Sequence, residues 1–83
     1  MNNTRNIYGE QLIKFLESIG CNKRNQVGEH ACLWSVFTGD FFIVPTYNFT
    51  LDKLTLKHII WQLGITESAF LKMWKQKINR TEN

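Results

Sequence analysis

The residues best suited to chemistry are Gly28-Glu29-His30, which place a histidine directly after a glycine turn and at the start of an apolar stretch. An imidazole titrates near neutral pH, so it can give or take a proton under physiological conditions. We expect His30 to lie at the edge of a sheet, partly exposed, where a ligand can reach it. The alternative is a turn histidine without a role, which is the commoner fate of a lone histidine.

Two neighbours affect what His30 can do. Glu29 either stabilises the charged imidazolium or is an ordinary solvated turn residue, and next to a phosphate it would be repulsive. Tyr47 either donates a hydrogen bond to a ligand oxygen or packs over its loop. His58 lies beside the apolar stripe of a helix and is expected to face solvent. The two histidines lack metal-ligand spacing and no carboxylate cluster accompanies them, so we predict no metal site.

The chain of 83 residues carries a net charge of +3 and is 43% apolar. Such a chain should form one packed domain spanning residues 1–83, with its core at about 8–78. The mild positive charge fits an anionic partner without requiring one. Cys21 and Cys32 have no C-x-x-C spacing and are expected to be reduced thiols. No apolar run approaches the length of about 18 residues for a membrane helix. We predict a cytoplasmic protein with no membrane contact and no small-molecule cofactor.

Hydrophobic periodicity predicts an α+β domain. A helical stripe runs from Tyr8 to Ile19, and a second comprises Leu56, Ile59, Ile60 and Leu63. Strands are expected at 22–26, 30–37 and 41–44, and a final helix is expected after Thr66 as its N-cap. The order is therefore α-β-β-β-α-α. Three antiparallel strands cannot bury both of their faces, so we expect the helices to pack on one face.

Strand alternation places His30, Cys32 and Trp34 on the same face of the second strand. The four apolar residues Phe41–Val44 indicate that both faces of the third strand are covered, or that one face carries a partner. Trp34 is then a platform for an unpaired base, a contact for a partner protein, or part of the core.

Several short motifs occur in a distinctive order along residues 8–71: Gly9 to Leu16 (GEQLIKFL), Gly20-Cys21, Gly28-Glu29-His30, Val44-Pro45 and Thr55 to Phe70 (TLKHIIWQLGITESAF). In this order and spacing the chain resembles the HicA (YcfA-like) mRNA interferase toxin family. The resemblance implies a double-stranded-RNA-binding-like fold with a three-stranded antiparallel sheet. It also implies the toxin of a type II toxin–antitoxin system, a metal-independent endoribonuclease that cleaves mRNA and is blocked by a HicB-like antitoxin.

The catalytic histidine of that family falls on His30, which the resemblance makes a general acid or base. The chain departs from the pattern twice: Glu29 stands where a serine is usual, and Tyr47 stands where a histidine often follows the proline. If the fold binds RNA mainly through the backbone, the expected RNA-binding residues are Lys23, Arg24, Glu29, Tyr47 and Lys57. The alternatives are ordinary solubilising charge for the cations and, for the whole chain, a non-catalytic relative that binds RNA or protein.

Overall fold

The computed structural model describes residues 6–82, with side chains up to residue 77. The elements in chain order are α1 (Gly9–Ser18), β1 (Asn22–Val27), β2 (His30–Trp34), β3 (Phe41–Pro45), α2 (Lys53–Leu63) and α3 (Glu67–Glu82). This order confirms the predicted α-β-β-β-α-α arrangement of an α+β domain. None of the helices in residues 6–82 has the length and apolar character needed to cross a membrane.

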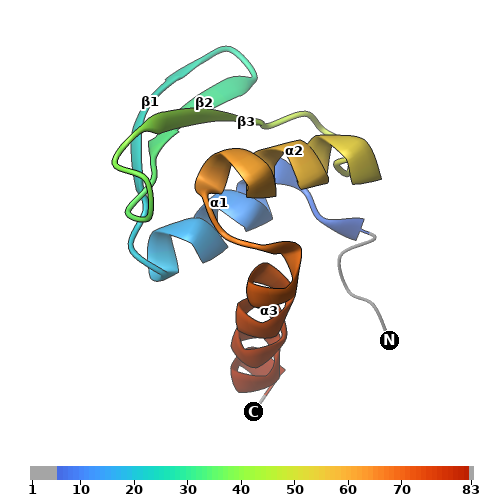
Figure 1. The fold of residues 1–83 in the computed structure, drawn as a ribbon. Coiled ribbons are helices and arrows are strands. Elements are labelled where there is room, and N and C mark those ends of the chain that lie inside the picture. Colours follow the sequence, from blue (N-terminus) through green and yellow to red (C-terminus); the bar gives the residue numbers. More distant parts are fainter. Residues whose placement is uncertain (1–5, 83) are drawn as a thin grey trace.

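The sheet is antiparallel, with β2 between β1 and β3. At one end His30 pairs with Val27 on β1 and with Pro45 on β3. At the other end Trp34 pairs with Asn22 and Phe41. Figure 1 shows α1 and α2 on one side of this sheet and α3 extending away from it. The prediction that the helices pack on one face is therefore confirmed, and within residues 6–82 no helix or strand covers the opposite face (Figure 1).

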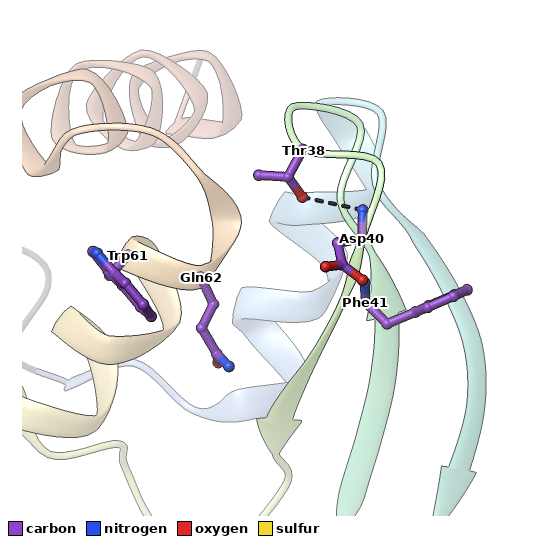
Figure 2. Close-up of a pocket in the computed structure, with 5 residues that line it drawn as sticks. All are labelled: Thr38, Asp40, Phe41, Trp61 and Gln62. Carbon is purple, nitrogen blue, oxygen red and sulfur yellow. Dashed lines mark hydrogen bonds between the residues drawn. The ribbon is translucent and has the colours of Figure 1, made fainter.

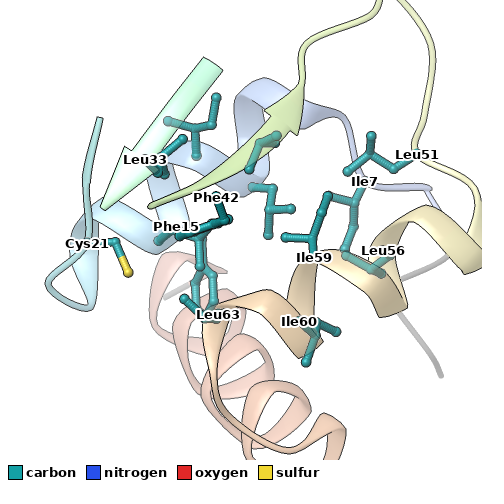
Figure 3. Close-up of a cluster of buried hydrophobic side chains, with 14 of the residues drawn as sticks. Ile7, Phe15, Cys21, Leu33, Phe42, Leu51, Leu56, Ile59, Ile60 and Leu63 are labelled. Carbon is teal, nitrogen blue, oxygen red and sulfur yellow. The ribbon is translucent and has the colours of Figure 1, made fainter. Parts of the chain in front are cut away.

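The hydrophobic core lies between the sheet and the helices, as Figure 3 shows. The sheet contributes alternate residues of its two apolar strands, namely Ala31, Leu33, Phe42 and Val44. The stripe predicted for α2 is buried in full, because every fourth or third residue of the helix faces the sheet. Phe70 and Trp74 attach α3 through edge-on contacts with Phe15 of α1.

The core begins at Ile7, one residue before the predicted start at residue 8. Ile7 is almost fully buried, and its carbonyl accepts a hydrogen bond of 2.8 Å from the Leu51 N–H. The segment before α1 is thereby joined to the segment before α2. A single apolar residue outside a periodic stripe gives no signal of this tertiary contact, so the sequence pattern missed it.

The second strand ends at Trp34, whereas the apolar pattern predicted it to continue to Phe37. Ser35 is fully buried and redirects the chain. Its hydroxyl donates to the Leu63 carbonyl at 2.7 Å. The same oxygen accepts from the Phe37 N–H at 3.1 Å and the Thr38 N–H at 3.3 Å. These bonds fold residues 36–38 into a turn and leave Val36 and Phe37 exposed.

Helix α2 begins at Lys53 because Asp52 caps it: its carboxylate accepts the Thr55 N–H at 2.7 Å. This hydrogen bond lowers the pKa of Asp52 below its ordinary value. The predicted cap of α3 is confirmed, since Thr66 Oγ1 accepts the Ala69 N–H at 3.0 Å. Helix starts are thus set by side chains that satisfy the first free N–H groups.

The start of α1 lies against the end of β3. Gly9 is buried, and a Cβ atom at this position would overlap the carbonyl oxygen of Pro45. Only a glycine permits this approach of helix and strand. The contact fixes the strand end from which the loop carrying Tyr47 departs.

Candidate active site

His30 occupies the first position of β2, immediately after a two-residue hairpin loop. Gly28 has a φ of 59°, whereas Glu29 does not have a positive φ. A positive φ at the first loop residue is typical of type II′ hairpins and favours glycine there. The tight turn places His30 opposite Val27, with its imidazole exposed at the end of the sheet's uncovered face.

Three rings form a row that starts at His30. The imidazole contacts Tyr47 edge to face, with ring centres 6.0 Å apart. Tyr47 in turn stacks on Phe49, with ring centres 4.9 Å apart and ring planes inclined by 18°. The loop after β3 therefore brings two aromatic side chains to the histidine. Of the residues expected to act with His30, Glu29 and Tyr47 are its immediate neighbours.

Hydrogen bonds hold this end of the sheet together. The Thr46 N–H donates to the Glu29 carbonyl at 2.8 Å, which extends the pairing of β2 and β3 by one step beyond His30. The Gln26 amide donates to the Gly28 carbonyl at 3.0 Å and to Thr46 Oγ1 at 3.3 Å. Thr46, at the start of the Tyr47 loop, is thus hydrogen-bonded both to Glu29 in the hairpin loop and to Gln26 on β1.

The rest of the uncovered face is apolar. The predicted shared face of His30, Cys32 and Trp34 is confirmed by the pairing of these residues with Pro45, Ile43 and Phe41. Cys32 and Trp34 are half-buried, and the exposed apolar members of this face are Val27, Phe41 and Ile43. The first explanation for the apolar run of β3, that both of its faces are covered, is wrong, because Phe41 and Ile43 are exposed. That one face carries a partner stays a prediction.

The predicted cations lie apart from His30. Lys23 pairs with Leu33 and is four residues, or about 13 Å, from Val27 along β1. Arg24 lies in the irregularity between Lys23 and Asn25. Lys57 is on α2, where its Nζ is 4.0 Å from Glu67 Oε2. No lysine or arginine occurs between Arg24 and Lys53 in the sequence. The formal charge next to His30 is that of Glu29.

A hollow of about 260 Å³ lies between α2 and the β2–β3 turn, lined by Thr38, Asp40, Phe41, Trp61 and Gln62. In Figure 2 the Asp40 carboxylate and the Gln62 amide face this space, while the Phe41 ring points away from it. The hollow adjoins Phe41, at the opposite end of β3 from the His30 partner Pro45. It is therefore separate from the site at His30, which is an open surface.

The other histidine is placed differently. His58 is exposed on α2 and stacks on Trp61, with ring centres 5.9 Å apart. Helix α2 lies on the opposite side of the sheet from the uncovered face (Figure 1).

Within residues 6–82, no three histidine, cysteine, aspartate or glutamate side chains come together in a way that could hold a metal ion. Both cysteines are free, and burial raises the pKa of the Cys21 thiol.

In comparisons with known proteins, no protein-family model matches this chain, and no curated protein or solved structure matches it significantly. The chemistry must therefore be inferred from the residues of this chain. The feature that the fold presents most clearly is an exposed histidine flanked by a glutamate and a tyrosine on an uncovered sheet face.

Proposed function

We propose that this protein is a metal-independent endoribonuclease that cleaves mRNA in the cytoplasm, with His30 as its general acid or base. In this proposal it is the toxin of a type II toxin–antitoxin pair, and a HicB-like antitoxin covers the face that carries His30. The supporting observation is the position of the imidazole: it is exposed, on the side of the sheet that the helices leave free, and in contact with the Tyr47 ring.

The reaction proposed is attack of a ribose 2′-oxygen on the neighbouring phosphorus. The new bond joins the 2′-oxygen to phosphorus, and the bond from phosphorus to the 5′-oxygen breaks. The 2′-hydroxyl proton goes to a base, and the leaving 5′-oxygen takes a proton from an acid. Imidazole can perform either transfer. The products are a 2′,3′-cyclic phosphate and a 5′-hydroxyl, and no metal enters the balance.

The surroundings of His30 suggest the roles of its neighbours in this proposal. Because the segment from Asn25 to Asp52 that carries the imidazole contains no lysine or arginine, the protonated imidazole would itself supply the positive charge that a phosphorane-like transition state requires. The Tyr47 hydroxyl is the nearby neutral donor for a phosphate oxygen. Lys23 and Arg24 of β1 then act as distant phosphate contacts that raise affinity for RNA rather than the rate of cleavage. Lys57 lies on α2, on the other side of the sheet (Figure 1), and is outside this path.

The test is cleavage of a short labelled RNA by purified protein in the presence of a metal chelator. We expect His30→Ala to reduce the rate by at least about 100-fold, the range over which a general acid or base contributes. His58→Ala is the matched control, because His58 is also exposed but lies on α2. A 2′-deoxy substitution at the cleaved nucleotide should abolish the reaction. Equal cleavage by wild type and His30→Ala, or none by either, contradicts the proposal.

The biological part of the proposal has its own test. Induced in bacteria, the wild-type protein should arrest growth, while His30→Ala should not. Co-expression of the neighbouring reading frame should restore growth, and its product should co-purify with the wild-type protein. Toxicity that survives His30→Ala would exclude a histidine-dependent mechanism.

A second function is favoured by the exposed apolar residues Val27, Phe41 and Ile43 on the uncovered face. An apolar patch on a small domain marks a contact surface for another macromolecule. In this alternative the protein binds RNA or a partner protein without catalysis. A gel-shift assay beside the cleavage assay separates the two: retention of intact RNA favours binding alone, and His30-dependent products favour the nuclease.

A further inference from the structure

We infer that the stacked rings of Tyr47 and Phe49 form a platform for one unpaired nucleobase, so that the site selects single-stranded RNA. This inference rests on the proposed function, since it names the part of the substrate that the site beside His30 would hold. Nothing in the sequence pattern pointed to Phe49, because it lies in a loop between predicted elements.

The rings have the geometry that such a platform needs. Phe49 is 61% exposed, yet its ring is held nearly parallel to that of Tyr47. Tyr47 thus supports one face of the Phe49 ring, and a base can stack on its solvent side. Stacking is open to every base because each presents a flat π-face, so the platform itself gives little sequence preference.

The loop that carries the platform is anchored at both ends. At its start, the Thr46 N–H donates to the Glu29 carbonyl at 2.8 Å. At its end, the buried residue Leu51 donates its N–H to the Ile7 carbonyl at 2.8 Å. A ring fixed in this way loses little conformational freedom when a base stacks on it, which favours binding.

The position of the rings links the base to the reaction. Tyr47 contacts both His30 and Phe49. A base on Phe49 therefore belongs to a nucleotide close to the phosphate at which His30 would transfer a proton. Bases inside an A-form duplex are already stacked and paired, so they cannot reach an aromatic side chain without being extruded. The arrangement should accordingly accept single strands and exclude duplexes.

Binding is best measured with His30→Ala as the background, because this variant should hold RNA without cutting it. The probes are a short single-stranded RNA and the same strand annealed to its complement. We expect Phe49→Ala to weaken single-strand binding by about 5- to 150-fold, the range for loss of one base–aromatic stack. Phe49→Trp should retain binding.

Trp61→Ala is the control, because Trp61 is also an exposed, stacked aromatic residue but lies on α2. It should leave the Kd within about twofold, since Trp61 adjoins no part of the proposed path of the RNA. Melting temperatures of all variants should match that of the background, because Phe49 is exposed and not part of the core.

The outcomes separate this inference from the nuclease proposal. If the wild type does not cleave RNA but Phe49 is needed to bind single strands, the nuclease fails and the platform stands. If His30-dependent cleavage occurs and Phe49→Ala changes neither KM nor the Kd, the platform is overturned. Equal affinity for the duplex also overturns it. The platform is also overturned if Phe49→Ala abolishes binding of the protein encoded by the neighbouring reading frame but leaves RNA binding unchanged. The two rings would then be a contact for that protein.

Discussion

Phe41 and Phe42 are adjacent residues of the same type, and they point to opposite faces of the sheet. Phe42 is 2% exposed beneath the helices, whereas Phe41 is 55% exposed on the uncovered face. The same contrast holds for the next pair of β3, in which Val44 is buried and Ile43 is exposed. The two faces of β3 carry similar residue types, so the direction in which a side chain points decides whether it is buried.

The contrast shows which residues the fold needs. Apolar area removed from water stabilises the folded state by about 25 cal/mol per Å², so the covered face supplies the stability. The exposed residues of the other face gain much less on folding. Apolar side chains that remain exposed together are expected where another molecule binds. The uncovered face is therefore the part of the sheet where substitutions should alter binding with little change in stability.

Substitution of the two phenylalanines tests this difference between the two faces most directly. Phe42→Ala should lower the free energy of unfolding by about 3–5 kcal/mol, because it leaves a cavity in the core. Phe41→Ala should cost less than about 1 kcal/mol, since its side chain is already half in water. Denaturant unfolding monitored by circular dichroism measures both. Similar losses for the two variants would show that the uncovered face also contributes to the fold.

Ser35 tests where the covered face ends. Ser35→Ala removes the hydroxyl that bonds Leu63, Phe37 and Thr38, and it leaves the buried carbonyl of Leu63 without this partner. We expect a loss of about 1–3 kcal/mol in the free energy of unfolding. Ser68→Ala, on the exposed first turn of α3, is the control and should be nearly neutral. A neutral Ser35→Ala would mean that the turn forms without this hydroxyl.

The reactivity of the two thiols compares the buried and the uncovered parts of the molecule without any substitution. Cys32 is half-buried on the uncovered face, while Cys21 is buried and has a pKa above its ordinary value of 9.0. A raised pKa means less of the reactive thiolate at any given pH below it. With an aromatic disulfide reagent at pH 8, Cys32 should react more than about tenfold faster than Cys21. Mass spectrometry of the labelled peptides gives both rates, and in denaturant the difference should disappear.

The sequence predicted those parts of the fold that depend on local periodicity and capping. The stripe of α2, the Thr66 cap and the order of the elements all follow from side-chain spacing within one segment. The placement of His30 after the Gly28 turn was also correct, because a tight hairpin needs a residue that tolerates a positive φ.

The features that were missed depend on contacts between distant segments. Ser35 ends β2 by bonding to Leu63, which is 28 residues away, so the apolar run alone suggested a longer strand. Ile7 is buried by its pairing with Leu51. The separation of Lys23 and Lys57 from His30 depends on the register of β1 and on the packing of α2 against the other side of the sheet (Figure 1). Composition shows that cations exist but not which surface they share.

The absent side chain of Gly9 has an effect far along the chain. Since the backbone of α1 abuts Pro45 and the Cα of Thr46, the helix start acts as a buttress for the loop that carries Tyr47 and Phe49. A methyl group at position 9 would displace the start of that loop, because it would overlap the carbonyl oxygen of Pro45 and crowd the Cα of Thr46. The position of the two aromatic rings therefore depends in part on Gly9, a residue without a side chain.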